Sequence, residues 1–138
     1  GSQRAYLENV VRHYGVSGST FLPGFMDPYP IMARAAVLAV SSLFEGMPLN
    51  IVEAFCLGLP VVAFDCPSGP RELMEEAHCG VLIPVGDVAA LADALQTALL
   101  QPPDVAARAA RLRRAEDFAP DRTIGVWQEV LAETAFPK

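Results

Sequence analysis

The sequence predicts an α/β fold, in which helices cover both faces of a doubly wound parallel sheet. Three observations predict it. Short apolar runs alternate with amphipathic stretches along the 138 residues, glycines and prolines separate them, and the connecting loops are short. This alternation favours parallel strands joined by helical crossovers. We find about four candidate strands, whereas complete sheets of this type usually have about five or six, so we expect the first strand or two to be missing.

The chain is expected to begin with a helix, a strand and a second, brief helix. Apolar residues at helical spacing predict the first helix over residues 5–14, and Gly15 ends it. The run at residues 20–22 is a short strand candidate, which a Pro-Gly pair ends. The brief helix covers residues 28–34, with Asp27 as its N-cap and a proline at its first position.

The middle of the chain repeats the unit of strand and helix. The continuous apolar run at residues 37–41 is typical of a parallel strand covered on both faces. A helix over residues 50–57 follows and ends at Gly58, and a second buried strand occupies residues 61–64. A proline at the first helical position then predicts a helix over residues 70–76.

The rest of the chain is expected to hold one strand and three helices. Residues 81–85 form the strand, and residues 88–100 form a helix with Asp87 as its cap and apolar side chains along one face. Two prolines separate it from an Ala- and Arg-rich helix over residues 104–116. A helix over residues 120–134, again with apolar side chains at helical spacing, closes the chain.

Charge and composition exclude two classes of function. Lys and Arg number 10 against 16 Asp and Glu, which gives a net charge of −6. No nucleic acid is expected as a partner, because that affinity depends on many cations that neutralise phosphates. All the basic residues are arginine except Lys138, the last residue. A Schiff base, a phosphate-loop lysine and a lysine general base are therefore excluded for this chain.

The cysteines and the first residues bear on the compartment. Cys56, Cys66 and Cys79 are widely spaced in apolar surroundings, so they form neither a disulfide framework nor a metal-ligand pattern. A reducing cytoplasm is the simplest interpretation. No apolar run approaches the roughly 18 residues of a membrane span. The first residues are unlike a signal peptide, and Gly1-Ser2 is typical of a cloning remnant.

The segment at residues 41–50 is the richest in candidate chemistry, because ligands of an open parallel sheet bind beyond the carboxyl ends of its strands. Glu45 lies in this loop and Glu53 in the first turn of the next helix, so both carboxylates are expected to face one crevice. N–H groups at that helix start form an anion site, helped by the helix dipole. Alternatively, Asn50 and Glu53 have the spacing of a capping box, which would make Glu53 structural.

The segment that follows the strand at residues 61–64 also has two interpretations. Ser68 or Gly69 can cap a helix that Pro70 begins, which is a purely structural role. Alternatively, this second helix start adds N–H groups, and the cation of Arg71, to the same crevice.

The remaining chemistry-bearing residues are weaker candidates. His13 and His78 have no cysteine or carboxylate at ligand spacing, so we expect no metal site. Cys66 lies at a strand end but lacks the His–Asn arrangement that would support a nucleophile. Four arginines of the helix over residues 104–116 most simply form a solvated face, or else a patch that meets an acidic membrane surface or another domain. They are Arg108, Arg111, Arg113 and Arg114.

A linked series of motifs resembles a known family. The stretch Glu45-Gly-Met-Pro-Leu-Asn-Ile-Val-Glu53 matches the two glutamates, separated by seven residues, of the retaining family 4 glycosyltransferases, or glycosyl transferases group 1. Phe21-Leu-Pro-Gly-Phe before it and Gly80-Val-Leu-Ile-Pro-Val-Gly-Asp after it are similar to the same family. The resemblance spans residues 4–100. It implies that residues 1–138 are one partial domain, the Rossmann-like C-terminal half of a GT-B fold, truncated at its N-terminus.

The resemblance implies a role for each position of these motifs. Glu45 would be the catalytic residue, holding hydroxyls of the transferred sugar and steadying positive charge at the anomeric carbon. Glu53 would accept hydrogen bonds from the ribose hydroxyls of the donor. Backbone N–H groups would meet the diphosphate or the sugar, although Pro48 has none to offer. The residues implied to bind the donor are Glu53, Gly46, Met47, Leu49, Asn50, Ser68, Gly69 and Arg71.

The implied reaction moves a sugar from a nucleotide diphosphate sugar, most often a UDP-sugar, to a glycan or lipid-linked acceptor with retention of configuration. No cofactor and no metal are implied, because side chains and helix ends replace metal in this fold. The stretch at residues 65–72 is similar to that of enzymes of bacterial surface polysaccharide biosynthesis. A cytoplasmic enzyme, peripheral at the inner face of the membrane, is the corresponding expectation, and an unpaired sheet edge would allow a homodimer.

The family also has an N-terminal acceptor-binding domain, and an Arg and a Lys that grip the diphosphate, which this chain lacks. We therefore expect the chain alone to be inactive. The alternative is a non-catalytic nucleotide-sugar-binding or protein-interaction module of the same fold, since doubly wound sheets host many functions. The presence of both Glu45 and Glu53 favours the enzyme, because a decayed module need not keep both.

Overall fold

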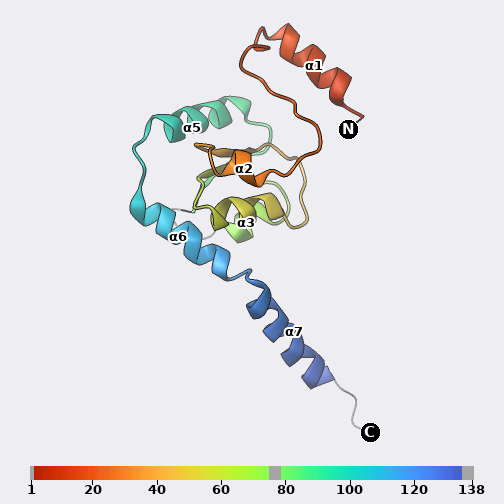
Figure 1. The fold of residues 1–138 in the computed structure, drawn as a ribbon, viewed down its shortest axis with the longest axis vertical. Coiled ribbons are helices and arrows are strands. Elements are labelled where there is room, and N and C mark those ends of the chain that lie inside the picture. The colour runs from red at the N-terminus through yellow and green to blue at the C-terminus, as the bar shows by residue number, and fades with distance from the viewer. Residues whose placement is uncertain (1, 75–78, 135–138) are drawn as a thin grey trace.

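The computed structural model describes residues 2–74 and 79–134 as an α/β body from which the first and last helices extend at opposite ends (Figure 1). Three parallel strands form one sheet in the order β1-β2-β3. The elements are α1 (Arg4–His13), α2 (Tyr29–Met32), β1 (Leu38–Val40), α3 (Leu49–Cys56), β2 (Val61–Phe64), α4 (Pro70–Leu73), β3 (Val81–Ile83), α5 (Val88–Leu100), α6 (Val105–Glu116) and α7 (Pro120–Thr134).

Helices cover both faces of this sheet, which confirms the predicted fold class. Successive residues of a strand point to opposite faces. Val61 and Ala63 of β2 therefore share a core with Phe55 of α3 and Ala110 of α6, whereas Phe64 packs on the other side, against α5. Figure 1 shows α5 on one side of the strands and α3 with α6 on the other. All four residues of β2 are buried, as expected for a strand covered on both faces.

The fourth strand expected at residues 20–22 is absent, and this prediction was wrong. The segment lies in the connection between α1 and α2, and Phe21 is 78% exposed. A run of three residues gains few ladder hydrogen bonds, which are too few to hold it against the open edge of β1, where the described sheet ends.

The outer strands are shorter and more exposed than their apolar runs predict. The run at residues 37–41 pairs only from Leu38 to Val40, and Ala39 is exposed instead of covered. The run at residues 81–85 pairs only as far as Ile83. Both strands lie at an edge of the described sheet, where no second neighbour holds the strand ends or completes the cover.

The helix expected over residues 70–76 begins at Pro70, and α4 extends to Leu73. The final residues of that expected helix lie outside the described part of the chain, as does His78. The cap predicted at Asp87 is confirmed: its carboxylate accepts a hydrogen bond from the N–H of Ala90 at 2.9 Å, at the start of α5. The helix predicted over residues 28–34 forms only as α2, whose N-cap is Pro28 and not Asp27, although Asp27 accepts a hydrogen bond from the N–H of Tyr29 at 3.0 Å.

Two arginines of α6 are anchors inside the fold, so a solvated arginine face was the wrong interpretation for them. Arg111 is only 6% exposed, and its Nε donates to the carbonyl of Gly58, just beyond the end of α3, at 2.9 Å. A cation is favourable there, because the C-terminal end of a helix carries partial negative charge. Burial lowers the pKa of Arg111, while the charges of Cys79 and Asp104 act in the opposite direction.

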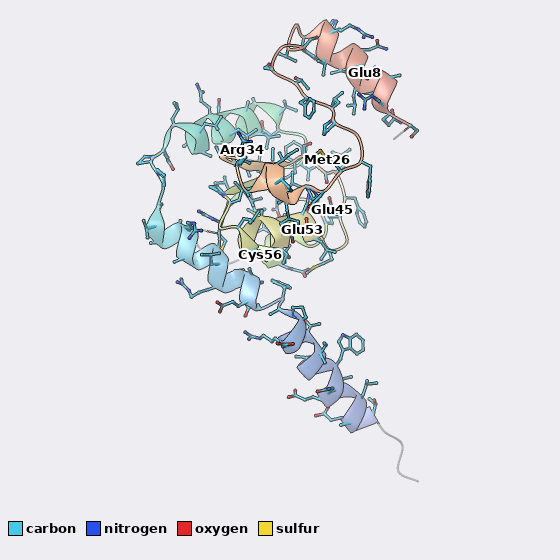
Figure 2. The ribbon with its side chains drawn as sticks, in the orientation of Figure 1. Glu8, Met26, Arg34, Glu45, Glu53 and Cys56 are labelled. Carbon is cyan, nitrogen blue, oxygen red and sulfur yellow. The ribbon has the colours of Figure 1, made fainter. Side chains whose placement is uncertain are left out.

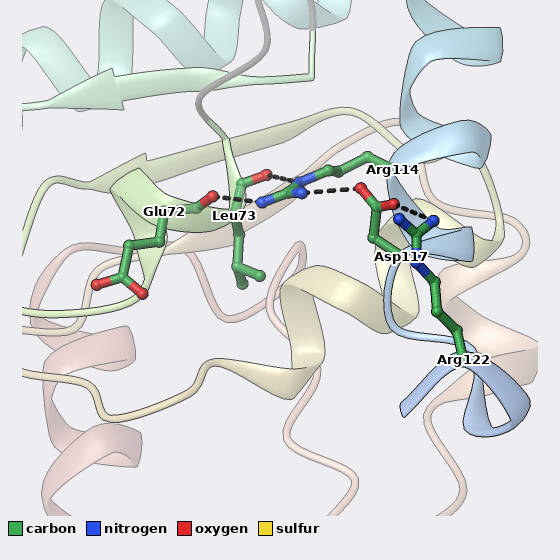
Figure 3. Close-up of polar contacts among 5 residues, drawn as sticks. All are labelled: Glu72, Leu73, Arg114, Asp117 and Arg122. Atoms are coloured by element: carbon green, nitrogen blue, oxygen red, sulfur yellow. Dashed lines mark hydrogen bonds and ion pairs between the residues drawn. The ribbon is translucent and has the colours of Figure 1, made fainter. Parts of the chain in front are cut away.

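Arg114 ties α6 to the end of α4 in the same way (Figure 3). Its Nε donates to the carbonyl of Leu73 at 3.1 Å and its Nη2 to that of Glu72 at 2.6 Å. Asp117 pairs with Nη1 at 2.8 Å, and Arg122 pairs with the other oxygen of Asp117 at 2.7 Å. Arg108 and Arg113 are exposed, so the solvated interpretation holds for them alone.

The two extending helices leave apolar side chains uncovered. Helix α7 forms as expected, yet none of its residues is buried, and Trp127 is 62% exposed. Helix α1 buries none of its residues either. On α5, the predicted apolar face packs on the sheet except at Leu99, which is 60% exposed.

Candidate functional site

The loops that follow β1 and β2 are joined to each other by their backbones. The N–H of Glu45 donates to the carbonyl of Pro67 at 3.1 Å, and the N–H of Ser68 donates to the carbonyl of Glu45 at 3.0 Å. Both loops leave the carboxyl ends of neighbouring parallel strands, which is where such sheets bind ligands. The structure thus brings Glu45 and Ser68, from two separate motifs of the sequence, into one site.

Gly69 closes the contact between these loops. Its φ of +97° is a backbone conformation that favours glycine. A Cβ at this position would lie 2.5 Å from Cδ of Pro48 and 2.8 Å from the carbonyl oxygen of Gly46. The absence of a side chain at Gly69 therefore allows the loop before α3 to approach the loop before α4. Gly46, Ser68 and Gly69 of the predicted donor-binding set lie together.

Glu45 is half-buried, and its carboxylate is held from within its own loop. The hydroxyl of Ser42 donates to Oε1 of Glu45 at 2.6 Å. This distance is at the short end for hydrogen bonds from a hydroxyl and is typical of bonds to a charged acceptor. The main chain and the side chain of Glu45 are thus both restrained.

Helix α3 begins one residue earlier than predicted, and the capping box is wrong. Pro48, with φ of −75° and ψ of 83°, turns the chain so that the N–H of Leu49 donates to the carbonyl of Met47 at 2.9 Å. This is an inverse γ-turn, for which the fixed φ of proline is suited. Asn50 therefore lies inside the helix and makes no side-chain cap hydrogen bond. The N–H of Leu49, which we expected to face the donor, donates within the chain.

Glu53 lies in the second turn of α3 and not in the first, because the helix begins at Leu49. Figure 2 shows Glu45 and Glu53 in the same region of the molecule, beside α2 and α3. The phenol of Tyr29 on α2 interacts electrostatically with Glu53. Desolvation is the main cause that raises the pKa of Tyr29, and the negative charges of Glu53, Cys56 and Asp27 raise it further. Glu53 has no capping role, and it is half-buried.

Arg71 is exposed, but its charge is already partnered. Its Nε donates to Oδ1 of Asp65 at 3.1 Å, and its Nη2 pairs with Oδ2 of the same carboxylate. This two-pronged contact orients the guanidinium at the end of β2. Arg71 therefore brings less net positive charge to the site than the sequence suggests.

Three residues of this arrangement escaped the sequence analysis. Ser42 lies three residues before Glu45, a spacing that suits a local side-chain contact in a loop, and this could have identified it. Asp65 lies six residues before its partner Arg71, across a turn that the sequence does not define. Tyr29 comes from a separate helix, so only the packing of α2 near α3 reveals it.

Two open hollows of the described surface lie elsewhere. One, of about 420 Å³, is lined by Pro30, Ile31, Arg34 and Ala35, and another, of about 220 Å³, lies where α6 meets α7. Neither is lined by Glu45 or Glu53. Ligands of this type of sheet bind at strand ends, so the clustered loops, and not these open hollows, form the candidate site.

Two further properties concern residues 2–74 and 79–134 only. No three His, Cys, Asp or Glu side chains there gather in a way that would hold a metal ion. No helix in that part of the chain is both long and apolar enough to cross a membrane.

Comparison with known proteins identifies relatives of the whole chain. The sequence pattern of the family described as glycosyl transferases group 1 matches residues 1–101. An exopolysaccharide phosphotransferase of Streptomyces coelicolor is 33% identical over 96% of this chain, which corresponds to 14% of that protein.

Solved structures show the same fold. The pneumococcal O-GlcNAc transferase GtfA, in complex with UDP and GlcNAc, matches 95% of this chain and 27% of its own with a TM-score of 0.82 and 24% identity. HepE of Anabaena, in complex with UDP, matches 96% of this chain and 37% of its own with a TM-score of 0.72 and 27% identity. The chain thus spans well under half the length of each of these relatives.

Proposed function

The chain belongs to the glycosyl transferases group 1 family, and from that premise we propose that it is the donor-binding side of a retaining glycosyltransferase. The enzyme moves a sugar from a nucleotide diphosphate sugar, a UDP-sugar, to a glycan or lipid-linked acceptor. A further, acceptor-binding domain completes it, and the 138-residue chain alone is inactive. The UDP in the structures of GtfA and HepE supports the choice of nucleotide.

The observation that carries this proposal is the junction of the two loops at the strand ends. Glu45 and Ser68, which the sequence offers as separate candidates, are joined there by two backbone hydrogen bonds. Glu53 follows in the adjoining helix α3 and has no capping contact to occupy it. A purely structural explanation of Glu53 therefore loses its basis.

In the proposed reaction each carboxylate has a separate task. Glu53 accepts hydrogen bonds from two ribose hydroxyls and so holds the donor. Glu45 holds hydroxyls of the transferred sugar and favours the positive charge that develops at the anomeric carbon. Exposed N–H groups of the loops face the diphosphate, whose negative charge grows as the bond to the sugar breaks. No step of this proposal uses a metal or another cofactor.

The test is turnover by the full-length polypeptide with UDP-GlcNAc, UDP-galactose and UDP-glucose in the presence of glycan and lipid-linked acceptors, followed as release of UDP. Glu45→Gln should lower kcat by about 100-fold, in the range for loss of one preorganised group at a reacting centre. Glu53→Gln should mainly raise KM for the donor, by about 10-fold, because its contacts are made in ground and transition states alike. Glu116→Gln, an exposed carboxylate on α6, is the matched control and should leave both constants unchanged.

The configuration of the product at the anomeric carbon, read by NMR, tests retention. If none of the three UDP-sugars is turned over or bound, the proposed donor is wrong. If Glu53→Gln leaves the donor KM unchanged, the role assigned to Glu53 is wrong.

One observation favours a second candidate, a nucleotide-sugar-binding module without transfer activity. The Streptomyces coelicolor relative is named a phosphotransferase, and this chain corresponds to only 14% of it. A domain of this type can thus form part of a protein named for other chemistry. Binding of UDP-sugars by the full-length polypeptide, with no UDP release in the presence of glycan or lipid-linked acceptors, would favour this second candidate.

A further inference from the structure

We propose that Ser42 is a positioning residue for Glu45. Its hydroxyl fixes the carboxylate of Glu45 so that one oxygen faces the donor sugar. This inference rests on the proposed function, because it assigns a partner to the residue that is placed next to the transferred sugar.

The main chain of Glu45 is held by the neighbouring loop. Its N–H donates to the carbonyl of Pro67 at 3.1 Å, and its carbonyl accepts from the N–H of Ser68 at 3.0 Å. Both backbone polar groups of Glu45 are therefore engaged with the neighbouring loop. What remains free to vary is the orientation of the side chain.

The hydroxyl of Ser42 restricts the orientation of the Glu45 side chain. Ser42 lies in the same loop, two residues beyond the end of β1. Its Oγ lies 2.6 Å from Oε1 of Glu45, and both residues are half-buried. An ionised carboxylate is an acceptor only, so the serine hydroxyl must donate its single proton to it.

The second oxygen of the Glu45 carboxylate, Oε2, takes no part in this hydrogen bond. Among the described residues, no side chain or N–H group donates to Oε2 of Glu45. Each carboxylate oxygen has its own lone pairs, so a bond to Oε1 leaves Oε2 able to accept from a sugar hydroxyl. A group held in advance costs less to order when the donor binds and reacts. Ser42 would therefore act on kcat, through Glu45, without touching the donor.

The experiment measures UDP release by the full-length polypeptide with whichever of UDP-GlcNAc, UDP-galactose and UDP-glucose it turns over fastest. Ser42→Ala should lower kcat by about 10-fold, the effect of losing one hydrogen bond to a charged group, with the donor KM within about 2-fold. Ser42→Thr keeps the hydroxyl and should restore kcat to within about 3-fold. Ser17→Ala, an exposed serine far from the site in sequence, is the control and should match the parent.

A double-mutant cycle separates positioning from loop structure. In a Glu45→Gln background, Ser42→Ala should cause no further loss of kcat, because the group it positions has already lost its charge. The melting temperature of each variant is measured alongside. Ser42→Cys provides a second variant of similar size with a weaker donor, so the test stands if the alanine variant does not fold.

The proposal is overturned if Ser42→Ala and Ser42→Cys keep the kcat of the parent, if Ser42→Thr is as slow as Ser42→Ala, or if the loss is equally large in the Glu45→Gln background. If Glu45→Gln still lowers kcat in these cases, only the role of Ser42 is wrong and the proposed function is unaffected. If Glu45→Gln itself keeps full activity, the role of Glu45 is wrong and the positioning role of Ser42 falls with it.

Discussion

Replacement of Gly69 by alanine should destabilise the fold far more than replacement of a glycine in open space. An alanine held at the φ of +97° costs about 1–2 kcal/mol. Its Cβ would also lie 2.5 Å from Pro48 and 2.8 Å from the carbonyl oxygen of Gly46, so the loop before α3 must move. Overpacking of this kind costs about 1–3 kcal/mol. The free energy of unfolding should therefore fall by about 2–5 kcal/mol in total.

Gly86 is the matched control for this prediction. Its φ of +82° is also one that L side chains rarely adopt, but nothing lies within 4 Å of the position of its Cβ. Gly86→Ala should therefore cost only about 1–2 kcal/mol. Urea unfolding followed by far-UV circular dichroism measures both variants, and the difference between them isolates the contact with the loop. Equal losses for Gly69→Ala and Gly86→Ala would refute the contact between the two loops.

Three further predictions follow from contacts outside that junction. Arg114→Ala should lower the free energy of unfolding by about 2–3 kcal/mol, because two backbone carbonyls at the end of α4 lose a charged donor; exposed Arg113→Ala should stay within about 0.5 kcal/mol. With the other two tyrosines changed to phenylalanine, absorbance titration should show Tyr29 ionising above pH 10, and Glu53→Gln should lower that pKa, since a nearby negative charge is removed. In native protein a thiol reagent should modify exposed Cys56 well before the two buried cysteines.

Each of these has a clear contrary outcome. Similar unfolding curves for the two arginine variants would mean that the carbonyl contacts contribute nothing. If Glu53→Gln leaves the pKa of Tyr29 unchanged, the two side chains lie too far apart to interact. A fast thiol reaction that survives Cys56→Ser would assign the reactive cysteine to another position.

The raised pKa of Tyr29 also makes the free energy of unfolding depend on pH. Its folded-state pKa is raised, so the neutral phenol is favoured in the native state. This contribution is present below the ordinary pKa of tyrosine and is lost as the pH rises through the folded-state value. The free energy of unfolding should therefore decline above about pH 10.

The sequence was a good guide wherever one local pattern decides the structure. The apolar run at β2 is buried along its whole length because β2 is the central strand and helices cover both of its faces. The predicted cap at Asp87 forms because a carboxylate one residue before a helix reaches the first N–H groups without any distant partner.

It was a poor guide where distant segments compete with a local pattern. The spacing from Asn50 to Glu53 is that of a capping box, but the turn at Pro48 starts the helix first. The solvated arginine face was wrong because Arg111 and Arg114 find carbonyls 41 to 53 residues away. The strand predicted at residues 20–22 does not form, because a run of three residues does not by itself show whether the segment pairs with the sheet.

The two backbone bonds between Glu45 and the loop at Pro67 and Ser68 have a consequence for protein engineering. A recognition loop transplanted alone from a relative would arrive without the surface that shapes it. The segment at residues 41–50 and the segment at residues 65–70 should therefore be exchanged as one cassette. Libraries that diversify the first segment while fixing the second would mostly sample misfitted pairs, so both segments should be varied together.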